Sequence, residues 1–446
     1  MTESKNRIVE GNIFKEMLIF VIPIFLSYLF QNLYNSIDSA IVGNYVSKQA
    51  LAAVSNCATV TNIMVGFFTG LSSGSLTIFS RYFGSAQYDK LDKSIHTSIT
   101  FSIIFGLIMA IAGFFSSGFL LKLMAFPDEI FIHAERYLKR YFLGSVFTAV
   151  FNIASGISRS IGDSKTPFKA LVITTFINAI LDITLIKYLH LEVVGAALST
   201  IVAQFVSCVL IFLSLVKNKN YFDIKLSKLE LDKTYLNEMF SKGLPAGIQT
   251  CLISLSNSLL QRYVNNFSTD IITGIGVAKK VDAFVAMPCQ SIGIATATFV
   301  SQNHGANNKK RIKQSVMVAS IMMVVSVTIM VIPTLLNVDL LVGLFNKDPG
   351  VIEAGSAMVK VIAPLYYFFG FMEIFVGLNR GFGKAIAVMI FSTLSMIVIR
   401  QIFLAIVFSF WQDIFFIHIC YPMCWAIAML FNVVYYFAFV RKEYMR

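Results

Sequence analysis

Residues 156–163 read GISRSIGD, and residues 377–384 read GLNRGFGK. The two stretches share a glycine, an arginine and a second glycine at a constant shift of 221 residues. Further pairs extend the match at shifts of 221 or 222 residues: Pro23 and Pro245, Ser80 and Ser301, Gly84 and Gly305, Ser94 and Ser315, and Lys139 and Lys360. Such a constant shift indicates an internal duplication. The chain is therefore expected to contain two similar halves of about 220 residues, an organisation typical of membrane transporters.

The composition indicates a membrane protein built from helices. Hydrophobic residues make up 57% of the chain and charged residues 13%, with a mean hydropathy of +0.73, whereas a soluble domain is about 25% charged. Apolar runs long enough to cross the bilayer as helices recur twelve times and are too long and too uniform for barrel strands. They cover about 14–36, 52–79, 95–121, 137–158, 170–186, 193–216, 243–264, 275–299, 315–336, 356–378, 386–407 and 416–440. We therefore expect an all-α polytopic membrane protein with twelve transmembrane helices in two six-helix lobes.

The domain boundaries follow from the one long polar connection. Residues 1–216 are expected to form the N-terminal six-helix lobe, residues 217–242 a cytoplasmic connector, and residues 243–446 the C-terminal six-helix lobe. An even number of spans gives both lobes the same orientation, so a pseudo-two-fold axis along the membrane normal is expected to relate them. The first apolar run is too long for a signal-peptide core and is expected to remain as a span.

The net charge of +12 is explained by topology. With both termini placed in the cytoplasm, most lysines and arginines fall in the inner loops, as the positive-inside rule requires. A nucleic-acid partner is therefore not expected. The chain is interpreted as a multi-pass protein of the cytoplasmic (inner) membrane of a prokaryote, a monomer surrounded by membrane lipids.

Enzyme chemistry finds no support in the sequence. The five histidines are scattered, and neither an HExxH nor a GxSxG motif is present. The sequence lacks a phosphate-binding loop of the GxxxxGK type, so direct use of ATP is not expected. We predict that the protein is not an enzyme and uses no cofactor.

A polar stripe runs along the first predicted span. Ser27, Gln31, Tyr34 and Asp38 follow one another at intervals of four, three and four residues, which places them on one helical face. Polar side chains are costly in a bilayer, so this stripe is expected to face a water-filled cavity or the interior of its lobe. The alternative is that Asp38 only caps the end of the helix near water.

The fifth predicted span carries a second acid. Asp182 follows Asn178 by four residues, so both side chains share a face. Thr200, in the sixth span, is a candidate neighbour. Burial disfavours the charged form of a carboxylate, so Asp182 could hold either a proton or a small metal cation, with Asn178 and Thr200 completing the shell. The alternative is a purely structural hydrogen bond between helices.

Other polar and small residues in the spans leave more than one interpretation open. Asp282 lies beside two lysines and either pairs with them near an interface or has a function. Glu373 is central in its span and is a candidate for contact with substrate or protons. Arg262 and Arg400 either neutralise carboxylates or act in transport. Gly66, Gly70 and Gly74 recur at intervals of four, which predicts close helix packing.

These residues together resemble the multidrug and toxic compound extrusion (MATE) transporters. The resemblance covers essentially the whole chain. The motifs that carry it are Pro23, Gln31, Tyr34, Asp38 and Gly43 in the first span; GISRSIGDSKTP at 156–167; Asn178 and Asp182; Gly195, Ala196, Ala197 and Thr200; and Gly377, Arg380 and Gly383.

The resemblance implies a twelve-helix exporter of cationic amphiphilic compounds driven by inward protons or sodium ions. It implies a cation-coupling site, and a metal site if the ion is sodium, formed by Asp38, Asn178, Asp182 and Thr200. Substrate contacts are then expected from Gln31, Tyr34, Asp38, Met64 and Asn152, with Glu373 as a further candidate. One departure is that residues 242–268 lack an acid that part of the family carries there. The rival function is a flippase for a lipid-linked oligosaccharide or another lipid-like substrate.

Overall fold

The computed structural model describes residues 6–124, 126–217 and 221–444. Within these ranges the chain forms helices joined by short turns, without a β-strand. Ten helical runs in this described part are long and apolar enough to cross a membrane, and the bent pair α5 and α6 forms an eleventh candidate. Helix α9 (Lys233–Val264) has 32 residues but a more polar sequence, in which Gln249, Ser256 and Asn257 interrupt the apolar run. The predicted all-α membrane fold is confirmed, and twelve spans are consistent with these helices.

The contacts divide the chain into two compact units. The first unit is Leu26–Gly247, and the second unit is Met1–Phe25 together with Ile248–Arg446. Both boundaries fall inside helices, one in α2 (Ile13–Tyr45) and one in α9. The units therefore exchange the first half of α2 and the first half of α9 relative to a simple division at the connector. The predicted lobes 1–216 and 243–446, with the connector 217–242, describe the sequence repeat and stay a prediction.

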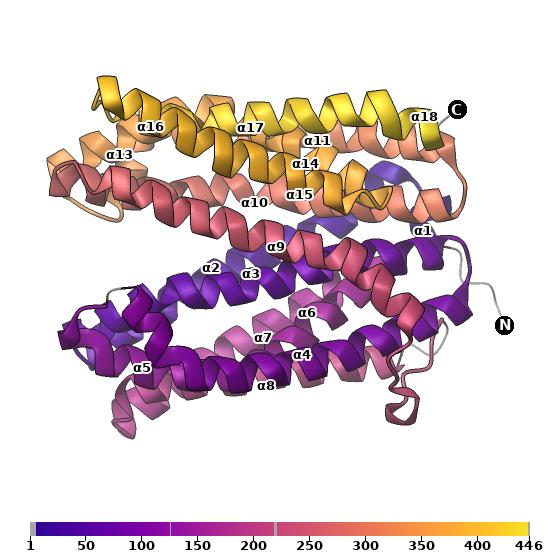
Figure 1. Cartoon of the computed structure of the whole chain (residues 1–446), viewed down its shortest axis with the longest axis horizontal. Coiled ribbons are helices and arrows are strands. Elements are labelled where there is room, and N and C mark those ends of the chain that lie inside the picture. The colour runs from indigo at the N-terminus through magenta and orange to yellow at the C-terminus, as the bar shows by residue number, and fades with distance from the viewer. Residues whose placement is uncertain (1–5, 125, 218–220, 445–446) are drawn as a thin grey trace. The chain divides into compact units, whose positions relative to one another are not determined.

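The first unit packs helices that follow one another closely in sequence (Figure 1). Helix α6 contacts α3, α4 and α8, and α5 contacts α3, α4 and α8. Besides parts of α2 and α9, the unit contains α3 (Lys48–Gly84), α4 (Tyr88–Leu123), α5 (Asp128–Leu143), α6 (Ser145–Ser160), α7 (Lys165–Asp182), a π-helical segment (Ile183–Tyr188), α8 (Glu192–Lys217) and a 3-10 turn (Leu226–Lys228).

The fourth predicted span is a bent pair of helices. Helices α5 and α6 meet at Gly144 with a bend of 48°. A side chain at this position would place its Cβ 2.6 Å from the Oε1 atom of Gln204, so only glycine fits beside α8. The predicted run 137–158 therefore corresponds to parts of two helices, because the apolar pattern continues through the bend.

Two glycines of α3 bring that helix against the beginning of α9. A Cβ on Gly70 would lie 2.4 Å from the carbonyl oxygen of Ala246, and a Cβ on Gly74 would lie 2.2 Å from that of Lys242. Both neighbours are backbone atoms, so the helices approach closely only because side chains are missing. The close packing expected from the glycine row is confirmed at these two positions.

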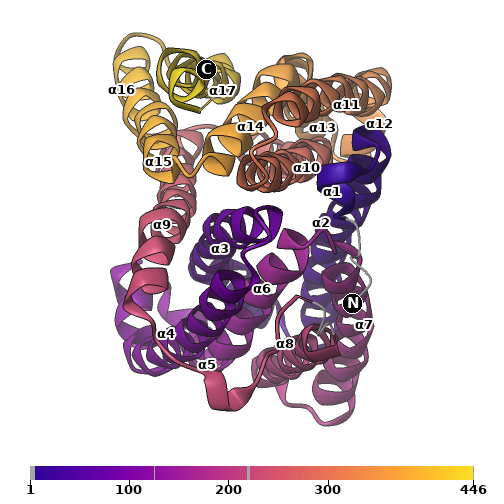
Figure 2. The same cartoon turned by 90° about the vertical axis from the view of Figure 1, so that its right-hand side faces the viewer.

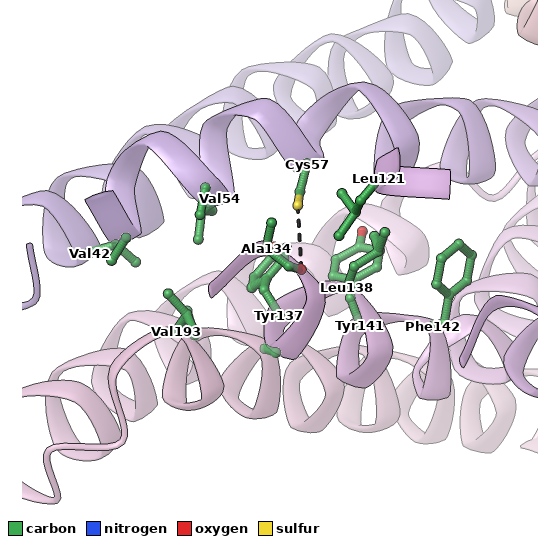
Figure 3. Packing of buried hydrophobic residues seen from close by; sticks show 14 of the residues in the cluster. Val42, Val54, Cys57, Leu121, Ala134, Tyr137, Leu138, Tyr141, Phe142 and Val193 are labelled. Atoms are coloured by element: carbon green, nitrogen blue, oxygen red, sulfur yellow. Dashed lines mark hydrogen bonds between the residues drawn. The ribbon is translucent and has the colours of Figure 1, made fainter. Parts of the chain in front are cut away.

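An apolar cluster fills the interior of the first unit where α3, α5 and α8 meet. Figure 3 shows Tyr137, Leu138 and Tyr141 of α5 packed among residues of the neighbouring helices. The Sγ atom of Cys57 points at the carbonyl oxygen of Ala134 at 3.7 Å and is fully buried. Packing of this kind holds α5 firmly against α3, which fixes the positions of the two tyrosines.

The second unit is centred on α10, which contacts α11, α13 and α14 (Figure 2). The tenth predicted span again has a break, because Pro364 lies in a 3-10 turn between α13 and α14 and cannot donate a backbone hydrogen bond. Besides parts of α2 and α9, this unit contains α1 (Arg7–Glu10), α10 (Thr269–Gly305), α11 (Lys309–Leu336), α12 (Val338–Gly343), α13 (Pro349–Ile362), a 3-10 turn (Ala363–Leu365), α14 (Tyr366–Gly381), α15 (Ala385–Thr393), a π-helical segment (Leu394–Ile399), α16 (Arg400–Phe410), α17 (Phe415–Tyr435), a second π-helical segment (Tyr436–Val440) and α18 (Arg441–Tyr444).

Candidate functional site

A cavity of about 400 Å³ lies within the first unit. Its walls come from α2, α3, α5, α6, α7 and α8, and they combine aromatic rings with hydroxyl and amide groups. Among the described residues that line it, Asp38 is the only one with a formally charged side chain. The lining residues are Gln31, Tyr34, Asn35, Asp38, Val54, Ser55, Ala58, Thr61, Asn62, Val65, Tyr137, Tyr141, Thr148, Phe151, Asn152, Leu171, Thr174, Thr200, Ala203, Gln204 and Ser207.

Two carboxyl groups meet at one side of this cavity. Asp38 of α2 is 8% exposed, and Asp182, the last residue of α7, is completely buried. The two carboxyl groups are in hydrogen-bonding contact with each other, and the hydroxyl of Ser199 donates to Oδ1 of Asp182. Oδ1 of Asp38 and Oδ2 of Asp182 have no other donor among the described residues. The site therefore has unused acceptor capacity in a buried place.

Hydroxyl groups surround the carboxyl pair. The phenol of Tyr34 donates to Oγ1 of Thr200 at 3.2 Å, and Thr200 donates in turn to the carbonyl oxygen of Ala196 at 2.9 Å. Asn178 is 1% exposed and lies one turn before Asp182 on the buried face of α7. Its Nδ2 atom has no acceptor among the described residues. The predicted set Asp38, Asn178, Asp182 and Thr200 thus lies within one unit, with the two acids in direct contact.

The backbone changes its geometry directly after Asp182. The α-helix ends there, and residues Ile183–Tyr188 continue as a π-helix. Wide turns of this type are uncommon and are found frequently at functional sites. They add a residue to the turn and thereby alter which side chains face the interior.

The predicted substrate residues fall into two groups. Gln31, Tyr34, Asp38 and Asn152 all line the cavity. Met64 is 4% exposed and belongs to the apolar cluster of the first unit, outside the lining. Glu373 belongs to the second unit, where its Oε2 atom would lie 2.8 Å from a Cβ placed on Gly293. Direct contacts from Met64 and Glu373 to a substrate stay predictions that this cavity does not support.

Several lining residues were missed by the sequence reasoning. Tyr137 and Tyr141 of α5 face the cavity, as do Phe151 of α6 and Ser207 of α8. The two tyrosines are spaced four residues apart on an amphipathic helix, and this spacing could have indicated a common buried face. Their closeness to Asp38, however, is a long-range contact that no local pattern announces.

A family model described as MatE matches residues 23–184 and, a second time, residues 245–406. The chain is 28% identical over 403 residues to the probable multidrug resistance protein YpnP of Bacillus subtilis (strain 168), covering 90% of each protein. It is 24% identical over 373 residues to the multidrug export protein MepA of Staphylococcus aureus (strain COL), covering 83% of this chain and 82% of that one.

Solved structures show the same fold. A crystal structure of MATE in complex with MaL6 matches with a TM-score of 0.91 at 20% identity, covering 100% of this chain and 99% of the other. The outward-facing conformation of a multidrug resistance MATE family transporter of the MOP superfamily matches with a TM-score of 0.90 at 20% identity and the same coverage. The double match of the family model coincides with the internal duplication seen in the sequence.

Proposed function

The chain belongs to the MatE family, and we propose that it is a secondary antiporter that exports small amphiphilic cations in exchange for an inward-moving cation. The single observation that carries the proposal is the position of Asp38, which lines the cavity and also contacts the buried Asp182. One carboxyl group is thus available both to a substrate in the cavity and to an ion shared with its neighbour. Relatives named as multidrug export and multidrug resistance proteins support this function.

The lining supports a substrate that is both aromatic and positively charged. The rings of Tyr34, Tyr137, Tyr141 and Phe151 offer faces to a cation, and Asp38 offers a negative charge. Cation–π contacts contribute about 0.5–2 kcal/mol each, more when water is excluded. The hydroxyl and amide groups of the wall can accept or donate hydrogen bonds at several places, which suits substrates of varied shape.

The carboxyl pair supports a proton as the coupling ion. Two ionised carboxylates in contact repel each other, whereas a single shared proton gives each a hydrogen-bond partner. In the proposed cycle, a proton entering from outside binds the Asp38–Asp182 pair and cancels the charge that holds the substrate. The substrate then leaves to the outside. Loss of the proton to the cytoplasm restores the charge, and the next cation binds.

Sodium is the alternative coupling ion. It would use oxygen ligands from Asp38, Asn178, Asp182 and Thr200, the set predicted from the sequence. All four are buried, and Asp182 already accepts a hydrogen bond from Ser199, which leaves fewer of its oxygen lone pairs for a metal. Exchange under separately imposed gradients distinguishes the two ions.

The test is transport by the purified protein in liposomes, with ethidium as the probe. We expect a proton gradient alone to drive ethidium movement against its concentration gradient, and a sodium gradient alone to have no effect. Asp182→Asn and Asp38→Asn should abolish this coupled movement. Asp89→Asn, which alters an exposed acid in the first turn of α4, is the matched control and should transport normally.

Two outcomes would contradict the proposal. Uphill ethidium movement by Asp182→Asn at the wild-type rate would remove the carboxyl pair from coupling. Dependence on sodium alone would replace the proton. The same liposomes report on any chemical change of the probe, and we propose that ethidium is recovered intact because the protein transports and does not catalyse.

We further propose that the protein acts as a monomer in the cytoplasmic membrane of a prokaryote with both termini inside. The relatives cited above are bacterial, and the lysine-rich connector favours the cytoplasmic side. The flippase alternative is not favoured, because a lipid diphosphate needs a cationic cavity and the described lining residues include neither lysine nor arginine.

A further inference from the structure

The second unit buries an arginine whose charge is not neutralised by the helices around it. Arg400, the first residue of α16, is 3% exposed. Its Nε atom donates to the hydroxyl of Ser256 at 3.2 Å, and its Nη1 atom donates to Oδ1 of Asn257 at 3.0 Å. Its Nη2 atom is buried and has no acceptor among the described residues. A guanidinium group with an unused donor inside a membrane-spanning helix is costly and marks a functional place.

A second cation lies beside this arginine. Lys279 of α10 is close enough to Arg400 for the two charges to repel, and its Nζ atom donates to Oε1 of Gln261 at 3.3 Å. Among the described residues, no carboxylate oxygen comes within 4.0 Å of either cation. Asp282 lies farther from Lys279 and accepts a hydrogen bond from Tyr366. Two cations and one more distant acid leave one positive charge to be balanced.

The sequence repeat relates this place to the carboxyl pair of the first unit. A shift of 222 residues carries Asp38 to Leu260 and Asp182 to Leu404, and both leucines are completely buried. The same shift carries Asn178 to Arg400. The shift rises from 221 to 222 here because the π-helical segment Leu394–Ile399 before Arg400 adds one residue to its turn.

The duplication has therefore reversed the charge of the site. In the first unit the two related positions hold acids, and in the second unit they hold apolar side chains while the amide has become a guanidinium. The amide oxygens of Asn257 and Gln261 are already bound to the two cations. Tyr421 places its ring 6.0 Å from the guanidinium carbon. The remaining polar capacity of Arg400 and Lys279 consists of N–H donors only.

We propose that this cluster, defined by Asn257, Gln261, Lys279, Arg400 and Tyr421, binds a singly charged oxyanion group with two terminal oxygens. One oxygen would accept from Nη2 of Arg400 and the other from Nζ of Lys279. A carboxylate on a small amphiphile and the phosphodiester of a lipid headgroup share this chemistry. The proposal goes beyond export of cations, because it concerns the other unit and a ligand of opposite charge.

The experiment measures binding to the full-length protein purified in a neutral detergent. Two probes separate the sources: 1-naphthoate, with 1-naphthamide as its uncharged counterpart, and short-chain phosphatidylglycerol, with a diacylglycerol as its uncharged counterpart. Heats of binding and the rise in melting temperature are recorded for each probe. We expect one charged probe to bind and its uncharged counterpart to fail.

Variants connect the binding to the cluster. Lys279→Gln should weaken binding of the charged probe about ten- to a hundredfold, the range for loss of a hydrogen bond to a charged group. Lys280→Gln changes the exposed neighbouring lysine, which stacks on Phe345, and should bind as the wild type does. Arg400→Gln should abolish binding, and Arg400→Lys should restore it in part.

The outcomes are distinguishable. Binding of naphthoate that needs Lys279 identifies a carboxylate ligand, and binding of phosphatidylglycerol that needs Lys279 identifies a lipid. Equal affinity of Lys279→Gln and wild type for both charged probes overturns the proposal, as does equal binding of charged and uncharged probes. Because Arg400→Gln may lose its fold through Ser256, the lysine variants decide the result. Ethidium transport by Lys279→Gln is measured separately, so failure of the anion site is distinguishable from failure of the export function.

Discussion

Replacement of Gly74 by alanine should destabilise the first unit more than its chemistry suggests. The new methyl group would lie 2.2 Å from the carbonyl oxygen of Lys242 and 2.4 Å from the Cα atom of Gly243. Both are backbone atoms of α9, so neither can rotate away. Since comfortable contacts lie at about 3.5 Å or more, α3 and α9 must separate locally by roughly 1 Å. Overpacking of this kind costs about 1–3 kcal/mol.

The assay is the melting temperature in detergent, followed by size-exclusion of heated samples. A loss of about 1–3 kcal/mol corresponds to a decrease of about 2–12 °C for a unit of this size. Gly276→Ala is the matched control, because a Cβ there meets no atom within 4 Å. That change lies inside α10 and should raise stability by up to about 1 kcal/mol through helix propensity.

The result that would refute the reasoning is a Gly74→Ala protein that melts like the wild type. An equal decrease in Gly276→Ala would also refute it, because the effect would then belong to any glycine in a long helix. Gly70→Ala, with its Cβ 2.4 Å from the carbonyl oxygen of Ala246, should behave like Gly74→Ala.

Three further predictions concern other contacts. Tyr34→Phe should keep ethidium affinity in a fluorescence titration, whereas Tyr34→Leu should lower it about two- to thirtyfold, because only the second change removes the aromatic face. Tyr82→Phe removes a hydrogen bond of 2.7 Å to the carboxylate of Glu238 and should cost about 1.5–3 kcal/mol in thermal unfolding. Arg311→Gln removes two hydrogen bonds, of 2.9 and 2.7 Å, to backbone carbonyls around α1, so trypsin should cut faster after Arg7; unchanged cleavage would show that these bonds do not hold α1.

Much of the fold could be predicted because lipid imposes simple rules on sequence. Long apolar runs announced the helices, and the repeated prolines and glycines announced two copies. The polar stripe with Gln31, Tyr34 and Asp38 marked the cavity wall, since such side chains are tolerated in a span only beside water or polar partners. The same rule singled out Asp182.

What escaped prediction depends on contacts between distant helices. The meeting of Asp38 with Asp182 joins residues far apart in sequence, and neither local pattern contains the other. Met64 lies on a helix with one face on the cavity and another in the core, and spacing alone did not separate these faces. The division of α2 and α9 between units falls inside continuous helices, although Pro23 and Pro245 lie two residues before the two boundaries.

The exchange of α2 between units has a consequence for synthesis in the cell. Phe20 is 2% exposed and packs edge-on against Phe299, with ring centres 6.0 Å apart. At about 5–20 residues per second, the ribosome reaches Phe299 roughly 15–55 s after Phe20 has emerged. During that interval the start of the nascent chain lacks its final neighbours, and acyl chains or an insertase must shelter it. Slowing translation between the two copies should therefore lengthen the time in which quality-control proteases can reach the amino-terminal segment.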